Sequence, residues 1–103
     1  MPLREHPEVA DFITYLRLKN LSPRTIREYQ KVLGSLFRYV KLSDSSSAEI
    51  TTPQLRDYVA SMQERGLAAK TVSNHVIVIK RFFGFLLAQG YIEEDPSLRI
   101  SPP

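Results

Sequence analysis

The feature that most constrains the fold is the run at residues 70–89, KTVSNHVIVIKRFFGFLLAQ. Its second half is apolar almost all round, from Val76 to Leu87, and is interrupted only by Lys80, Arg81 and a glycine. A helix that is apolar on every side is buried among other helices. The run therefore predicts the central helix of a small helical domain. Its first half is polar and contains no acidic residue, so this end presents donors and positive charge.

Three further helices are predicted from apolar periodicity and from end signals, at about residues 7–19, at about residues 23–41, and from about Thr51 to a stop at Gly66. The second begins with a serine N-cap followed by proline. The third begins with a T-x-x-Q capping box. Residues 42–49 are expected to be a mobile, serine-rich connection, and residues 91–103 an extended or turn-like tail. No alternating pattern predicts a strand.

An internal repeat appears at an offset of 46 residues, where residues 20–26 (NLSPRTI) align with residues 66–72 (GLAAKTV). We interpret it as two helical hairpins of the same design. Any short hairpin needs a C-cap and a turn, which would explain the Asn/Gly and leucine positions. That explanation does not cover a basic residue followed by threonine in the first turn of each second helix, at Arg24-Thr25 and Lys70-Thr71.

Composition narrows the class of protein. The chain has 103 residues, enough for one domain, and it has no cysteine, which excludes disulfides, thiolate metal sites and cysteine nucleophiles. No apolar run of about 18 residues and no signal-peptide region is apparent, so we expect a cytoplasmic protein without membrane contact. The net charge is +3, yet residues 22–41 sum to +4 and residues 70–89 to +3, leaving −4 on the rest. Clustered charge of this kind favours a polyanionic partner.

A basic residue in the first turn of a helix faces the positive end of the helix dipole, so two such residues suggest an anionic ligand. Further basic residues follow along residues 23–41, although a solvated basic face is the simpler alternative. On residues 70–89 the exposed stripe is expected to comprise Lys70, Ser73, Asn74, Ile77 and either Lys80 or Arg81. These side chains could contact DNA or could merely face water.

No metal or cofactor site is expected. His75 is interpreted as a partly buried packing residue, and His6 has no evident partner in the sequence. No glycine-rich phosphate loop, catalytic Ser/His/Asp motif or paired carboxylates on a cleft-forming face are present, so the chain is not expected to be an enzyme.

Several motifs in order resemble the N-terminal core-binding domain of the tyrosine recombinases, the phage-integrase family. They are F-x-x-Y-L and L-S-P-x-T-I-x-x-Y within residues 12–37, I-T-x-x-x-L-x-x-Y-V at residues 50–59, and G-L-x-x-x-T-V, I-K-x-F-F-x-F-L and G-Y-I-x-x-x-P within residues 66–96. The resemblance implies an all-α, SAM-like orthogonal bundle of four to five helices, made of two crossing helical hairpins. It would occupy residues 1–100, with residues 101–103 beginning a linker to a catalytic domain that this chain lacks.

The resemblance also implies that the second and fourth helices contact the major groove and the phosphates of double-stranded DNA. The DNA-binding residues carried over by position are Arg24, Thr25, Arg27, Glu28, Lys31, Lys70, Thr71, Asn74, Lys80 and Arg81. Ile77 and Val78 depart from a polar pattern, which favours backbone contacts at that point. Other implied partners are the C-terminal catalytic domain of the same parent and further recombinase protomers on DNA, with a monomer expected for the domain alone.

Two alternatives remain open from the sequence. The first is a SAM-like protein-interaction domain whose basic faces are incidental. The second is a helix-turn-helix regulator, which would need a dimerisation element that the sequence does not show.

Overall fold

The computed structural model describes residues 6–41 and 46–101, which form four α-helices and one short 3₁₀ helix. The elements are α1 (Pro7–Leu18), α2 (Pro23–Tyr39), η2 (Ser47–Glu49), α3 (Thr52–Glu64) and α4 (Ala69–Ala88). Within these residues there is no strand. The four predicted helices are confirmed, and each observed end lies within two residues of its predicted position.

The helix starts follow the capping chemistry that the sequence predicts. The Ser22 side chain accepts a hydrogen bond from the backbone N–H of Thr25 at 3.1 Å. At α3 the capping box is complete, because the Thr51 N–H donates to Gln54 Oε1 at 2.9 Å and the Gln54 N–H donates to Thr51 Oγ1 at 3.4 Å. Each bond satisfies a backbone donor that the helix itself leaves unpaired.

The two hairpin turns share one backbone geometry, which supports the internal repeat. Asn20 and Gly66 both adopt positive φ, at 62° and 79°. In both turns the next residue, a leucine, donates its N–H to the carbonyl five positions earlier, Leu16 in one case and Met62 in the other, at 3.2 Å. This is the pattern of a left-handed helix C-cap, in which glycine or asparagine is favoured.

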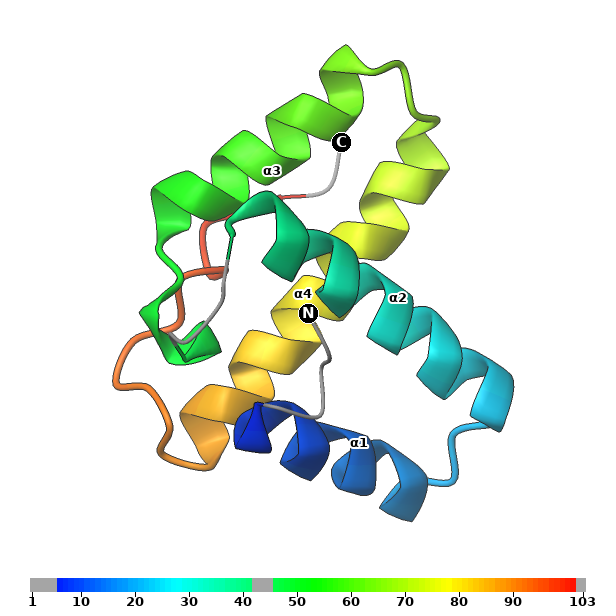
Figure 1. Ribbon diagram of the computed structural model, residues 1–103, viewed down its shortest axis with the longest axis vertical. Helices are drawn as coiled ribbons and strands as arrows, with labels where there is room; N and C mark the ends of the chain where they lie inside the picture. Colours follow the sequence, from blue (N-terminus) through cyan, green and yellow to red (C-terminus); the bar gives the residue numbers. More distant parts are fainter. Residues whose placement is uncertain (1–5, 42–45, 102–103) are drawn as a thin grey trace.

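Helix α4 runs through the middle of the bundle and contacts α1, α2 and α3 (Figure 1). Eight of its residues are buried: Val72, Val76, Val78, Ile79, Phe82, Phe83, Phe85 and Leu86. By length and composition α4 could also cross a membrane, with a mean hydropathy of 1.2 over its most apolar stretch. The core helix of a folded bundle passes the same test, and three helices cover this one.

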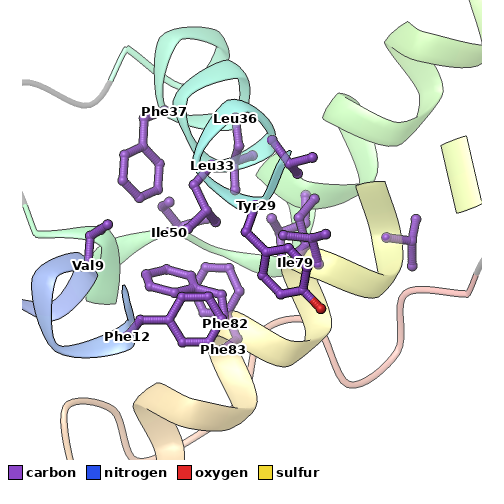
Figure 2. Packing of buried hydrophobic residues seen from close by; sticks show 14 of the residues in the cluster. Val9, Phe12, Tyr29, Leu33, Leu36, Phe37, Ile50, Ile79, Phe82 and Phe83 are labelled. Atoms are coloured by element: carbon purple, nitrogen blue, oxygen red, sulfur yellow. The ribbon is translucent and has the colours of Figure 1, made fainter. Parts of the chain in front are cut away.

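The core is built where the two hairpins, α1–α2 and α3–α4, cross. Figure 2 shows Phe12 of α1 facing Phe82 and Phe83 of α4, with Leu33 and Phe37 of α2 above them. The ring centroids of Phe12 and Phe82 are 5.3 Å apart, in an edge-to-face arrangement. Phe82 and Phe83 are both fully buried, so neighbouring positions of one helix face different parts of the core. The apolar run predicts burial on several sides of α4, but Ile77 and Leu87 within it are exposed, so the helix is not covered all round.

The connection between the hairpins is more structured than the sequence suggests. Residues 42–45 lie outside the described residues, but Ser47 begins η2 and is fully buried. Its N–H and hydroxyl donate to Glu8 Oε1 at 3.1 and 2.7 Å. His6, for which no partner is evident in the sequence, is buried too, with Nδ1 3.6 Å from the same carboxylate and its ring edge-on to Phe37. A buried polar cluster thus fastens the connection to the start of α1.

As predicted, the tail after α4 folds back on the bundle in turns, and residues 89–101 form no further helix. Ser97 and Ile100 are buried, and the Thr52 hydroxyl donates to the Pro96 carbonyl at 2.7 Å. Asp95 accepts hydrogen bonds from the N–H and hydroxyl of Ser97, so this acidic residue shapes a turn instead of only solvating the tail. Of the predicted linker start at residues 101–103, the last two residues lie outside the described residues.

Candidate nucleic-acid interface

Helix α2 presents a row of exposed basic side chains, Arg24, Arg27, Lys31 and Arg38. The Lys31 ammonium lies 3.6 Å from the Glu28 carboxylate, and the two side chains are 76% and 62% exposed. An ion pair this exposed contributes little free energy, and either partner can exchange it for another contact. The row is therefore available to an anionic ligand.

The first turn of α2 is capped by its own chain. The Ser22 hydroxyl lies 3.0 Å from the Thr25 hydroxyl in addition to accepting the Thr25 N–H, and Thr25 is only half-exposed. Arg24 stands in this turn without an acidic residue to balance it. The positive end of the helix dipole and the guanidinium therefore add their fields at one place.

The first turn of α4 has the same sequence pattern but a different cap. Its N-cap is Ala68, whose side chain accepts no hydrogen bond, and the turn contains no acidic residue. Lys70 and Thr71 are both exposed. The leading N–H groups of α4 thus lack a side-chain acceptor, so this helix end can donate to an external anion.

A shallow groove separates α2 from α4. Its walls are formed by Thr25, Glu28, Tyr29 and Val32 of α2 and by Thr71, Asn74, His75, Ile77, Val78 and Arg81 of α4. Five of the predicted contact residues meet here: Thr25, Glu28, Thr71, Asn74 and Arg81. Arg24, Arg27, Lys31 and Lys70 are exposed but do not line this groove.

Arg81 bridges the two walls of the groove. One of its guanidinium N–H groups donates to the hydroxyl of Tyr29. The Tyr29 ring is buried in the core, while its hydroxyl oxygen is directed away from the other core side chains (Figure 2). This contact holds a positive charge beside the groove instead of leaving Arg81 to extend freely.

Lys80, next to Arg81 in the chain, makes different contacts. Its ammonium donates to the backbone carbonyls of Ser97 and Leu98, at 2.6 and 3.3 Å, and the residue is half-buried. Lys80 therefore fastens the tail to α4 and does not line the groove. Of the two residues that the sequence leaves as alternatives for the exposed stripe, the geometry places Arg81 in the groove.

His75 is half-buried, as predicted, but it also lines the groove. Its Nδ1 lies 3.0 Å from the Tyr58 hydroxyl, which also bonds the Ser35 hydroxyl at 2.9 Å. Burial lowers the pKa of His75, with Arg65 acting in the same direction and Glu28 opposing it. Burial disfavours the charged form of Tyr58 as well, and this raises the pKa of its hydroxyl. At neutral pH the imidazole is therefore uncharged and is oriented by α3.

His75 and Tyr29 line the groove but are not among the contact residues predicted from the sequence. Each lies four positions after a predicted threonine, His75 after Thr71 and Tyr29 after Thr25, and this spacing puts residues on one helix face. That spacing could have identified both. Among residues 6–41 and 46–101, no three histidine or carboxylate side chains gather as metal ligands.

Comparison with known proteins gives a consistent result. A family model described as "Phage integrase, N-terminal SAM-like domain" matches residues 9–90. The chain is 28% identical over 98 residues to tyrosine recombinase XerD of Oceanobacillus iheyensis, covering 92% of this chain and 33% of that protein. It is 31% identical over 94 residues to tyrosine recombinase XerC of Bacillus pumilus, covering 89% of this chain and 31% of that protein. The chain thus spans about a third of the length of these curated relatives.

A solved structure shows the same fold. In a crystal structure of a lambda integrase(75-356) dimer bound to a COC′ core site, a region covering 34% of that chain superposes on 99% of this one with a TM-score of 0.78. Sequence identity is 17%, so the likeness concerns the arrangement of the helices.

Proposed function

Because the chain belongs to the family of phage-integrase N-terminal SAM-like domains, the N-terminal domains of tyrosine recombinases, we propose that it binds double-stranded DNA through α2 and α4. In this proposal α4 faces the major groove, and the basic residues on both helices hold the phosphates. The domain by itself neither cleaves nor joins DNA.

The observation that carries the proposal is the placement of the positive charge. Arg24, Arg27 and Lys31 on α2, and Lys70 and Arg81 on α4, are all exposed on the two helices that enclose one groove. The rest of the chain has a negative sum, as the charge distribution in the sequence shows. A duplex that neutralised these residues would release counterions, which is the main source of non-specific affinity for DNA.

The remaining parts of the proposal concern the whole protein. We propose that the parent is a site-specific tyrosine recombinase acting in the cytoplasm. Its C-terminal catalytic domain would bind the same DNA, and other protomers would bind beside it. The similarity to XerC and XerD proteins, of which this chain spans about a third, supports it. Alone, the domain should bind as a monomer and weakly, with a Kd of about 10⁻⁴–10⁻⁶ M at physiological salt.

An NMR titration with a short duplex tests the interface. Chemical-shift changes should map to residues 24–31 of α2 and residues 70–81 of α4, and should weaken as salt is raised from about 50 to about 200 mM. The variant Arg24→Glu/Lys70→Glu should lose binding while its helicity is retained, because both side chains are exposed in first turns.

A matched control separates the interface from simple net charge. Arg56→Glu/Arg99→Glu makes the same change of charge at two exposed residues that line a depression on another part of the surface, beside Glu93 and Glu94. This variant should bind nearly as well as the parent. Equal loss of binding in both double variants, or shifts confined to α1 and α3, would refute the interface and favour a protein-interaction domain.

The same titration distinguishes Lys80 from Arg81. The slope of log K against log salt is negative, and neutralising a residue that contacts a phosphate makes it less steep by about 1. Arg81→Gln should show this reduction. Lys80→Gln should leave the slope unchanged, because its ammonium is committed to the Ser97 and Leu98 carbonyls.

A further inference from the structure

Ile77 is an apolar residue on the polar stripe of α4. Its side chain is 42% exposed, whereas those of Val76 and Val78 on either side are 0% and 6% exposed. It lines the groove together with Asn74 and Arg81, which lie three positions before it and four after it on the same helix face. The exposed part of Ile77 is therefore available to a ligand in the groove.

We propose that Ile77 contacts the C5-methyl group of thymine in the major groove, so that α4 prefers A·T pairs at this position. The proposal rests on the DNA-binding function proposed above. An aliphatic side chain gains nothing from a phosphate, but the thymine methyl is the one apolar group that base pairs present in the major groove. Ile77 is then a specificity residue among phosphate and polar contacts, where the sequence alone favoured backbone contacts.

The spacing along α4 fits successive base pairs. Three residues of helix advance about 4.5 Å, which is between one and two base-pair rises of about 3.4 Å, and a helix inclined to the DNA axis advances less along that axis. If Asn74 reaches the edge of one pair, Ile77 lies over the next. Asparagine pairs with the adenine edge, so both residues would favour an A·T-rich step.

The test removes and adds methyl groups without requiring the natural target sequence. Binding is measured by NMR titration or fluorescence anisotropy for an alternating A·T duplex and the same duplex with deoxyuridine in place of thymidine. A second pair compares an alternating G·C duplex with its 5-methylcytosine counterpart. Burying one methyl group against an apolar side chain is worth about fourfold in affinity. The methylated member of each pair should therefore bind about two- to fourfold more tightly.

The preference must depend on Ile77. In Ile77→Ala the ratio between the members of each pair should fall to about one. Leu87→Ala is the matched control, because Leu87 lies on the same helix with the same 42% exposure but lines the depression near the tail. It should keep the parental ratio. Because T and U are also compared on the unmodified protein, the methyl preference itself is measured without any variant, and only its assignment to Ile77 uses Ile77→Ala, a change at an exposed residue.

The outcomes separate the two proposals. Salt-dependent binding without a methyl preference, or a preference that Ile77→Ala retains, overturns the role of Ile77 and leaves DNA binding standing. Failure of all four duplexes to bind refutes DNA binding by α2 and α4 itself. A methyl preference that disappears in Ile77→Ala and persists in Leu87→Ala establishes the contact.

Discussion

Replacing Glu8 by alanine should destabilise the domain far more than a change at the first turn of a helix normally does. The Glu8 carboxylate is 4% exposed and accepts both the N–H and the hydroxyl of the fully buried Ser47. A hydrogen bond to a charged group is worth about 1.5–3 kcal/mol. The two bonds together therefore represent about 3–6 kcal/mol, and alanine would also strand a buried N–H. A domain of this kind has only about 5–15 kcal/mol in total.

The measurement is thermal and urea unfolding at neutral pH, followed by circular dichroism. For a domain near 100 residues, each 1 kcal/mol lowers Tm by about 4–8 °C. Glu8→Ala should thus lose about 12 °C or more. Glu8→Gln keeps an acceptor oxygen but not the charge, so its loss should be about half as large, since a neutral hydrogen bond contributes about 0.5–1.5 kcal/mol.

The pH dependence provides an independent check. Burial raises the pKa of Glu8, but the hydrogen bonds from Ser47 and the nearby His6 outweigh it, and the pKa lies below its ordinary value of 4.5. A carboxyl with a depressed pKa stabilises the fold above its unfolded-state pKa and loses that contribution as pH falls through the folded-state pKa. The stability difference between the parent and Glu8→Gln should therefore shrink as the pH falls below about 4.

Glu64→Ala is the control for this series, because Glu64 is an exposed glutamate at the end of α3. It should change stability by no more than about 0.5 kcal/mol. If Glu8→Ala cost as little as Glu64→Ala, the Glu8–Ser47 contact would not hold the connection between the hairpins, and the reasoning from burial and hydrogen bonding would be wrong.

Two further predictions concern the core and the chemistry. Phe83 is fully buried on α4, so Phe83→Ala should cost about 3–5 kcal/mol; a fall in Tm of only a degree or two would contradict the central role of this helix. The domain should form no covalent adduct when incubated with supercoiled DNA that carries the parent's target site, because the Tyr58 hydroxyl that meets His75 is buried with a raised pKa and is therefore not an activated nucleophile. A protein–DNA adduct resolved on a denaturing gel would refute that expectation.

The helices could be predicted from the sequence because their signals are local. Ser22 with Pro23, and Thr51 with Gln54, each define a helix start within a few residues, and the structure shows the bonds that this spacing predicts. The burial of α4 against three other helices follows from apolar residues on several of its sides. The exposure of Ile77 and Leu87 does not follow from that pattern. The repeat at Asn20 and Gly66 appears as one shared turn geometry.

The contacts that sequence analysis missed join residues far apart in the chain. Glu8 and Ser47 are 39 positions apart, and Lys80 reaches the carbonyl of Ser97 across 17 positions. Neither pair has a spacing that identifies it, because the partners depend on how the hairpins cross. For the same reason the sequence could not separate Lys80 from Arg81, which are adjacent in the chain. Lys80 donates to the tail at the Ser97 carbonyl, whereas Arg81 donates to the Tyr29 hydroxyl beside the groove.

The repeated hairpin explains why a basic residue occupies the first turn of both α2 and α4. Thr25 and Thr71 occupy equivalent positions of the repeat, and both line the same groove, so the two hairpins bring matching first turns to one surface. Arg24 and Lys70, one position earlier, each oppose the positive end of a helix dipole, at about 0.3–1 kcal/mol. That cost recurs in both halves of the domain, where local helix stability would favour an acidic residue. A phosphate beside each turn would attract both the basic side chain and the positive end of the dipole. The basic first turns therefore reduce the stability of the free domain, and bound DNA would offset that loss.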